Sequence, residues 1–509
     1  MKRLTAVLVI AFTCLLSAAD ERIDEAVNAR LKMEGFQHSQ VMTTLSWLSD
    51  VHGPRLTGSP ALRRAGEWAR DEMTRWGLKN AALESYGPVG RGWTIERFDI
   101  SMTSPQWTRV IGYPRAFSPS LATPLSGTPV LVEVKSKADF EKYRGKLRGA
   151  IVMNGRPEVQ PIGFEAEAKR LTDAELAKQA AEIHPATGDA PKSYWDEEDD
   201  WLKSLEKQTE IARFFETEGI AALVEPSATS EVVRVGGFYD HVWKPTYPGF
   251  VIAREQYGRI VRLLDLKQPV NLSLSLTATF ADNADGFNVI AEIPGSDPAL
   301  ASEVVMLGGH LDSWHTGTGA TDNAAGCAVA MEAMRLLTAI GAHPRRTIRV
   351  ALWSGEEQDY FGSMGYVRKH FGDPKTMALK PEHAKLDAYF NLDNGGGKIR
   401  GVNLQGNESA RSLFEAWLKP FAYLGAATIT TANTGGTDHM SFDAVGLPGF
   451  QFIQDPLNYE SRAHHTNLDV YEEVVPEDLQ QAAVVLASVV YHAAMRDAMV
   501  PRKALPKAR

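Results

Sequence analysis

The chain has 509 residues and a formal net charge of -9 at pH 7. A chain of this length is too long for one simple core, so we expect two domains or one domain with a large insert. The negative charge and the lack of a basic stripe argue against nucleic acid as the main partner.

The start of the chain has the pattern of a secretory signal peptide. Two basic residues precede an apolar run over residues 4–16, and a small-residue cleavage pattern ends at Ala19. The apolar run is too short to span a membrane. We therefore expect residues 1–19 to be removed and the mature protein to be secreted or periplasmic, with no membrane span. Cleavage would also remove Cys14 and leave Cys327 alone, so no intrachain disulfide is expected.

Residues 20–116 predict helices and strands that have no separate core. Residues 24–49 and 60–76 look helical, and the second stretch carries apolar residues at helical spacing. Residues 93–102 and 107–113 look like strands. We expect this segment to pack on a sheet formed later in the chain, as the N-terminal part of a catalytic domain.

Residues 117–279 predict an inserted β-rich domain. It contains short strand-like runs, such as residues 129–134 and 250–253, but no cluster of catalytic side chains. Its polar part, residues 156–210, includes the acidic run 196–200 and is typical of a solvated surface excursion.

From residue 280 to the C terminus, buried strands alternate regularly with helices. This alternation favours an α/β fold with a mixed, mostly parallel central sheet flanked by helices. The expected strands are residues 288–293, 304–307, 347–353, 388–392 and 450–453. The expected helices include residues 324–337, 409–418 and 476–496.

Several of these strands end in side chains that can bind a metal. Because open parallel sheets bind ligands at the carboxyl ends of their strands, we expect these side chains to converge. They are imidazoles and carboxylates with no thiolate, a set that suits zinc, with manganese or cobalt as poorer candidates. The candidates are His310, Asp322, Glu356, Glu357, Asp393, His464 and His465.

Six motifs contain these residues: H-L-D-S-W, T-D-N-A-A-G, S-G-E-E-Q, N-L-D, G-T-D-H and H-H-T-N-L-D. In this order they resemble the di-zinc exopeptidases of the M28 type, which include aminopeptidase Y, bacterial leucyl aminopeptidase and plasma glutamate carboxypeptidase. The match covers the chain from about residue 288 to the C terminus. H-L-D-S-W and H-H-T resemble the plasma glutamate carboxypeptidase branch in particular. The inserted segment resembles the protease-associated domain of many members.

The resemblance implies a site for two zinc ions per chain. Asp322 would bridge the ions, and the peptide bond that follows it is cis in relatives. His310 and Asp393 would complete the protein ligands of one ion. Glu357 and His465 would complete those of the other. Each ion would then have room for a shared water or hydroxide, the open arrangement that hydrolysis requires.

The resemblance also implies roles around the ions. Glu356 would be the general base. It would take a proton from the metal-bound water and return it to the leaving amine. Asp312 would fix the tautomer of His310, and Asp469 would act in the same way near His465.

Two parts of the expected site face the substrate. Some relatives have a tyrosine before the last zinc-binding histidine, where it stabilises the tetrahedral intermediate. This chain has His464 there, which would either donate a hydrogen bond to the developing oxyanion or lie at the rim. Gly436, Thr437 and Asp438 are expected to form a pocket wall that binds substrate.

The expected function is therefore hydrolysis of terminal bonds of short peptides or dipeptides by a secreted di-zinc exopeptidase. A non-catalytic receptor or scaffold on the same fold and a glutaminyl cyclase-like acyltransferase stay open as alternatives. The recognised end of the peptide also stays open. A free carboxylate needs a cation, for which Arg55 and Arg462 are candidates, and a free amine needs acidic groups. The inserted domain could cover the pocket or mediate a homodimer.

Overall fold

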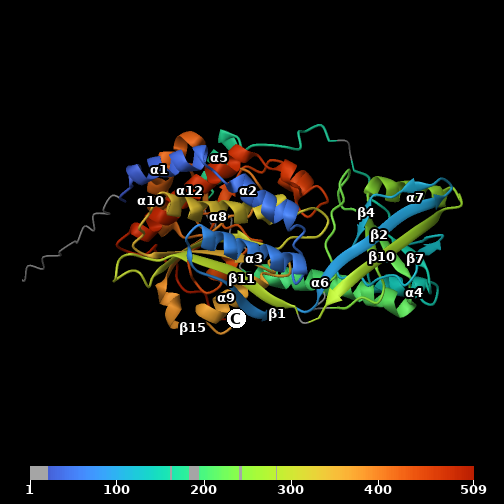
Figure 1. Cartoon of the computed structure of the whole chain (residues 1–509). Helices are drawn as coiled ribbons and strands as arrows, with labels where there is room; N and C mark the ends of the chain where they lie inside the picture. The colour runs from blue at the N-terminus through green and yellow to red at the C-terminus, as the bar shows by residue number, and fades with distance from the viewer. Residues whose placement is uncertain (1–20, 161–162, 183–193, 240–242, 283, 509) are drawn as a thin grey trace, which may run out of the picture.

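The computed structural model describes residues 21–160, 163–182, 194–239, 243–282 and 284–508. The predicted signal peptide lies outside the described residues. Figure 1 shows a larger lobe, in which helices surround a sheet, and a smaller β-rich lobe beside it. Among the helices that the structure describes, none combines the length and the apolar character needed to cross a membrane.

An eight-stranded sheet forms the centre of the larger lobe. In spatial order its strands are β1 (Lys79–Pro88), β11 (Asp285–Ile293), β13 (Thr347–Trp353), β12 (Val304–His310), β16 (Leu386–Asn391), β19 (Gly449–Gln454), β17 (Ile399–Asn403) and β18 (Thr428–Thr430). The middle four strands are parallel to one another. Antiparallel pairings occur toward the edges, where β11 joins β1 and β13 and where β17 joins β19. The mixed, mostly parallel sheet predicted from the sequence is confirmed.

Helices cover both faces of this sheet, because successive strand residues point to opposite faces. In β12, Val305 and Leu307 face one core and Met306 faces the other. The first core is formed with α1 (Glu25–Gln37), α2 (Val41–Ser46), α3 (Pro60–Arg75), α8 (Ala325–Ala339), α10 (Arg411–Leu418) and α12 (Pro476–Met495). The second is formed with α9 (Phe361–His370) and α11 (His439–Asp443).

Short elements connect these helices and strands. The helix predicted over residues 24–49 is divided into α1 and α2 and ends in a π turn. The connecting turns are η1 (Trp47–Val51), η3 (Ala320–Ala324), η4 (Pro381–Lys385), η5 (Glu408–Ala410), η6 (Lys419–Leu424), η7 (Tyr459–Ala463) and η8 (Tyr471–Glu473), and β14 (Gly372–Asp373) pairs with β15 (Ala378–Leu379).

The smaller lobe contains two sheets. One has the order β3 (Thr108–Arg109), β2 (Gly92–Ser104), β10 (Asn271–Ala281) and β5 (Leu125–Gly127). The other has the order β4 (Gly112–Pro114), β9 (Gly249–Ile252), β8 (Ala222–Pro226), β7 (Ile151–Asn154) and β6 (Val130–Val132). Its helices include η2 (Lys137–Asp139), α4 (Phe140–Tyr143) and α7 (Arg254–Asp265).

This lobe begins before the predicted insert. β2 pairs with β10 along its length, so the sheets take in residues from 92 onward. The strand predicted over residues 107–113 is split between β3 and β4, which belong to different sheets. The domain boundaries at residues 117 and 279, and the likeness to a protease-associated domain, stay predictions.

The predicted surface excursion is more ordered than its polarity suggested. It contains α5 (Asp173–Ala180) and most of α6 (Tyr194–Glu218). Arg170 forms ion pairs with Asp455 and Asp478 of the larger lobe, at 2.9 and 2.7 Å. The described residues from 163 to 182 are mostly exposed, as expected of a surface excursion, and Arg170 attaches them to the larger lobe.

Candidate metal centre

The predicted ligands meet at the carboxyl edge of the parallel strands. His310 ends β12, Glu357 follows β13 and Asp393 follows β16. Asp322 lies in η3, directly before α8, and His465 follows η7 in the loop after β19. Segments that are far apart in the sequence therefore supply one site, as the strand pattern predicted.

Asp322 lies between two pairs of side chains. Its Oδ1 is 3.2 Å from Nε2 of His310, and its Oδ2 is 3.2 Å from Nε2 of His465. Nε2 of His310 is also 3.3 Å from Oδ1 of Asp393. Nε2 of His465 is 3.1 Å from Oε2 of Glu357. The Asp322 carboxylate thus faces two separate sets of donors, by which we mean potential metal-ligand atoms. Each set consists of one imidazole and one further carboxylate.

These donors fit zinc. Ligand atoms on a tetrahedral zinc ion with bonds of 2.0–2.1 Å lie about 3.3 Å apart. Oδ2 of Asp322, Oε1 of Glu357 and Oδ1 of Asp393 are buried and accept no hydrogen bond from the described residues. A buried carboxylate oxygen without a hydrogen-bond donor destabilises the folded protein unless a cation compensates its charge. The geometry and the chemistry of this cluster therefore fit zinc binding around Asp322.

The surrounding carboxylates raise the pKa of both histidines. Burial by itself lowers the pKa of His310, but Asp393 and Glu356 raise it well above the usual value. Burial is likewise outweighed at His465, where Glu357 and Asp322 raise the pKa to about 10. The carboxylates around the two imidazoles therefore favour positive charge at this site.

The side chains of Glu356 and Glu357 lie near different histidines. The side chain of Glu357 meets His465, whereas Oε2 of Glu356 lies 4.0 Å from Nε2 of His310. Burial raises the pKa of Glu356 well above its usual value. A carboxyl group of raised pKa beside the ion site has the properties of a general base.

The backbone carbonyl and the carboxylate of Asp312 have different partners. Nδ1 of His310 donates to the backbone carbonyl of Asp312 at 3.0 Å, whereas the Asp312 carboxylate is 3.7 Å away. The carboxylate instead accepts from Oγ1 of Thr57 at 2.6 Å and from the backbone N of Glu356 at 3.2 Å. The tautomer of His310 is thus fixed by a carbonyl, and the carboxylate positions the segment of Glu356.

Asp469 was expected to orient His465, and this expectation is wrong. Its carboxylate accepts from the backbone N and Oγ1 of Thr321, at 2.6 and 2.7 Å, and from the backbone N of Asp322 at 3.3 Å. Asp469 therefore positions Thr321 and Asp322 and not His465. The peptide bond between Asp322 and Asn323 is cis, as the resemblance implied.

Replacing Asp469 with Ala is expected to weaken zinc binding by about tenfold to a hundredfold, the usual effect of losing a group that orients a ligand. The measurement is a zinc titration of the purified variant, with kcat/KM at saturating zinc. Asp387→Ala is the matched control, because Asp387 is also buried and accepts from the backbone N of Val500, but lies near the start of β16, at the opposite end of that strand from Asp393. Equal zinc affinities in both variants would contradict the role.

His464 lies at the edge of the ion positions. Its Nε2 is 3.9 Å from Oδ2 of Asp322, and its Nδ1 is 3.3 Å from Oε2 of Glu460. The ring stacks on Tyr459, with centroids 4.8 Å apart, and about a quarter of the side chain is exposed. His464 lines the cleft together with His465.

A cleft of about 450 Å³ opens above these residues. Gly436 lines it, but Thr437 and Asp438 do not. Oγ1 of Thr437 accepts from Asn391 at 2.9 Å, and Asp438 is buried at the start of α11, where burial raises its pKa to about 8. The expectation that these two side chains bind substrate is therefore revised: they lie behind the wall.

Six cleft residues were missed by the sequence analysis. Five of them lie within five residues of a predicted site residue in the chain, so proximity to the motifs was a usable signal. The sixth, Trp201, comes from α6, and no motif marks it. The six are Trp201, Asp359, Tyr360, Asn394, Tyr459 and Glu460.

Neither candidate arginine lines the cleft. Arg55 is fully buried and donates to backbone carbonyls of Leu48, Leu311, Thr318 and Gly319. Arg462 pairs with Glu473 at 3.3 Å. Both arginines are therefore wrong candidates for a carboxylate-binding cation.

The fold and the ligand set define a class, the metal-dependent exopeptidases built on a mixed α/β sheet. Residues 288–490 match the family model described as Peptidase family M28. Carboxypeptidase Q of Bos taurus is 27% identical over 476 residues, which cover 93% of this chain and 89% of that protein. Aminopeptidase YwaD of Bacillus subtilis is 27% identical over 208 residues, 38% of this chain and 42% of that protein.

Solved structures agree in fold. The Peptidase M28 precursor from Shewanella amazonensis has a TM-score of 0.68 and 24% identity, with 95% of this chain and 99% of that chain covered. BSAP, a zinc aminopeptidase from Bacillus subtilis, has a TM-score of 0.57 and 20% identity, with 90% and 95% covered. The resemblance to M28-type peptidases is confirmed, and the protein is a zinc-dependent exopeptidase.

Proposed function

We propose that the protein removes a terminal residue from short peptides or dipeptides with two zinc ions and Glu356 as general base. The observation that carries the proposal is the position of Asp322, whose two oxygens face two separate sets of donors. A single ion would need only one such set. The proposed ligands are His310, Asp322, Glu357, Asp393 and His465.

Bound zinc would polarise the scissile carbonyl and activate the attacking water. Glu356 would accept the proton of that water and return it to the leaving amine. The hydrogen bond from the backbone N of Glu356 to Asp312 keeps the base in place. His464 would donate a hydrogen bond to the carbonyl oxygen as negative charge develops on it.

The charges in the cleft support recognition of a free α-amine. Among the described residues that line the cleft, none is a lysine or arginine, and Asp359 and Glu460 add carboxylates beyond the proposed ligands and base. The hydrogen bond with His464 lowers the pKa of Glu460, so this carboxylate is ionised at neutral pH. We propose that these two groups hold the substrate's ammonium, which favours an aminopeptidase or dipeptidase over a carboxypeptidase.

Blocking the amine of a dipeptide is expected to lower kcat/KM by about tenfold to a hundredfold, the worth of a hydrogen bond to a charged group. Amidating the carboxylate of the same dipeptide should change kcat/KM less than about threefold, since no lysine or arginine lines the cleft in the part of the chain that the structure describes. The assay follows release of free amino acid. The opposite order would favour a carboxypeptidase, as the relatives' name suggests. A pyroglutamyl product from peptides with N-terminal glutamine would favour the cyclase alternative.

We also propose export of the protein, which the basic, apolar and small-residue pattern of residues 1–19 supports. The homodimer stays a prediction.

A further inference from the structure

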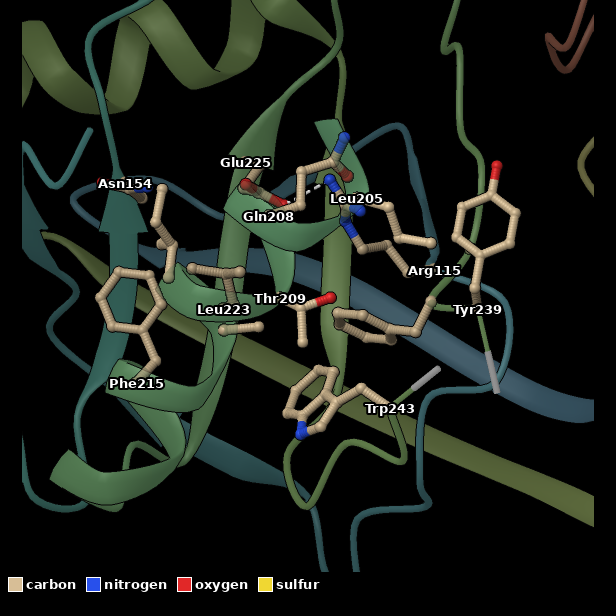
Figure 2. Close-up of a pocket in the computed structure, with 14 residues that line it drawn as sticks. Arg115, Asn154, Leu205, Gln208, Thr209, Phe215, Leu223, Glu225, Tyr239 and Trp243 are labelled. Atoms are coloured by element: carbon tan, nitrogen blue, oxygen red, sulfur yellow. Dashed lines mark ion pairs between the residues drawn. The ribbon is translucent and has the colours of Figure 1, made fainter. Parts of the chain in front are cut away.

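The smaller lobe contains a cavity that is separate from the metal cleft. Its volume is about 120 Å³, and none of the described residues lines both the cavity and the cleft. Its lining comes mainly from α6, from β7 and β8, and from residues 237–239 and 243, and Figure 2 shows these side chains. The proposed reaction uses none of them, so the cavity is a candidate for a second binding site.

The apolar part of the lining follows from the periodicity of one helix. Leu205, Ala212 and Phe215 recur at helical spacing on one face of α6. Leu223 of β8 also lines the cavity, and all four side chains are buried. The ring of Trp243 completes this part of the lining. Apolar cavities of about 150 Å³ stay dry and bind benzene, so this one has room for an apolar group of about four carbon atoms.

An ion pair forms the other part of the lining. Glu225 lies two residues after Leu223 in β8, so the two side chains share one face of the strand. Nη2 of Arg115 is 2.8 Å from Oε2 of Glu225, and about a quarter of each side chain is exposed. Figure 2 shows this pair and the ring of Trp243 on opposite sides of the group of lining side chains. The cavity therefore has a charged, partly exposed end and a buried apolar end.

The guanidinium has a hydrogen-bond donor that the protein does not use. Nε of Arg115 is buried and donates no hydrogen bond to any described residue. A buried donor without an acceptor destabilises the folded protein, so a ligand carboxylate that accepts from Arg115 would be stabilising. The contact of Arg115 with the ring of Phe238, at 5.6 Å from the guanidinium carbon to the ring centroid, helps to hold the guanidinium at this end.

The carboxylate of Glu225 restricts which ligands fit. A ligand that carries only a carboxylate would place it close to Glu225, and like charges repel each other. A ligand that carries only an ammonium would face the same repulsion from Arg115. A ligand with an ammonium next to its carboxylate avoids both, because each of its charges can lie beside the opposite charge of the pair.

We infer that the cavity binds a free α-amino acid with an apolar side chain of about the size of that of leucine. Its carboxylate pairs with Arg115, its ammonium pairs with Glu225, and its side chain fills the buried apolar end. The inference does not rest on the proposed function, because the cavity and the metal cleft share no lining residue among those described. A free amino acid is nevertheless what the proposed reaction would release.

The first experiment measures the binding of four compounds to the zinc-loaded wild type by isothermal titration calorimetry: leucine, glycine, 4-methylpentanoic acid and 3-methylbutylamine. Leucine should bind about tenfold or more tighter than glycine, which lacks the side chain that the cavity would remove from water. The acid lacks the ammonium of leucine and the amine lacks its carboxylate, so each should bind about tenfold or more weaker than leucine. Absence of leucine binding, or equal binding of leucine and the acid, would overturn the inference.

Two variants show whether leucine binds in the cavity. Arg115→Gln removes the cation, and Ala212→Leu fills the apolar end without changing any charge. Both should weaken leucine binding about tenfold or more and change kcat/KM on a dipeptide less than about threefold, since neither residue lines the metal cleft. Arg156→Gln is the matched control, because Arg156 pairs with Asp265 in the same lobe and does not line the cavity.

Hydrogen exchange of the wild type locates the ligand even if a variant fails to fold. Leucine should slow the exchange of backbone amides in α6 and β8, and glycine at the same concentration should not. Two results would show that the amino acid binds in the metal cleft instead, and would overturn the inference. One is protection confined to the segments that carry the proposed zinc ligands. The other is unchanged leucine binding in folded Arg115→Gln and Ala212→Leu.

Failure of this inference is distinguishable from failure of the proposed function. A zinc-loaded wild type that hydrolyses peptides but binds no leucine in the cavity keeps the function and excludes the second site. A wild type that binds leucine in the cavity but hydrolyses no peptide keeps the second site and excludes the function.

Discussion

Replacing Glu356 with Gln is expected to lower kcat by about 10²- to 10⁴-fold, the usual contribution of a general base. Zinc content should stay near that of wild type, because the residue does not belong to either set of donors around Asp322. Glutamine has the size of glutamate and keeps the backbone hydrogen bond to Asp312, so geometry is preserved while proton transfer is lost.

The measurement pairs initial rates on a dipeptide with metal analysis of the same sample. Glu292→Gln is the control, because Glu292 is also a mostly buried glutamate but pairs with Arg349 away from the site. Activity retained in Glu356→Gln would overturn the base assignment. Loss of zinc together with activity would instead make Glu356 a ligand.

Replacing Asp322 with Ala is expected to abolish turnover and to bring zinc content from the proposed two ions per chain to nearly none. The reason is that Asp322 is the one carboxylate that faces both sets of donors, so its removal leaves each ion with two protein ligands. Asp393→Ala and His465→Ala should each reduce zinc content toward one ion, since each belongs to a single set.

Stability should follow the metal. Zinc that binds only the folded protein stabilises it by about 4 kcal/mol per ion at a free concentration a thousandfold above Kd. Adding zinc to the metal-free wild type should therefore raise Tm, and the rise should be absent in Asp322→Ala. A variant that keeps both ions, or a Tm of wild type that does not respond to zinc, would contradict the shared site.

The strands that carry the site were predictable because they are buried on both faces and read as short apolar runs. β12, β13, β16 and β19 lie within a few residues of their predicted positions. The helix after Asp322 was predictable from its small residues, and in the structure it is buried almost all round as α8. The two edge strands, β1 and β18, were not predicted, because their residues alternate less clearly and their pairing depends on distant strands.

The roles of the residues around the proposed ligands depended on side-chain orientations, which a sequence motif does not contain. Asp312 and Asp469 are close to histidines in the sequence, which suggested contact with the rings. The folded chain instead turns the Asp469 carboxylate toward Thr321 and the Asp312 carboxylate toward Thr57 and Glu356. Thr437 and Asp438 are turned inward where α11 begins, so only Gly436 of that motif stays at the cleft.

By itself the sequence determined the order of ligands, the parallel strands that deliver them and the chemistry that imidazoles and carboxylates without thiolates can perform. These features are local, because each ligand sits at the end of its own strand or the start of its own helix. Tertiary structure alone decided that the insert reaches the cleft, since the contact of Trp201 with Tyr239, and of Val235 with His465, joins segments with no shared pattern. It also decided where the two candidate arginines lie, because Arg55 and Arg462 are held away from the cleft by the packing of the lobes.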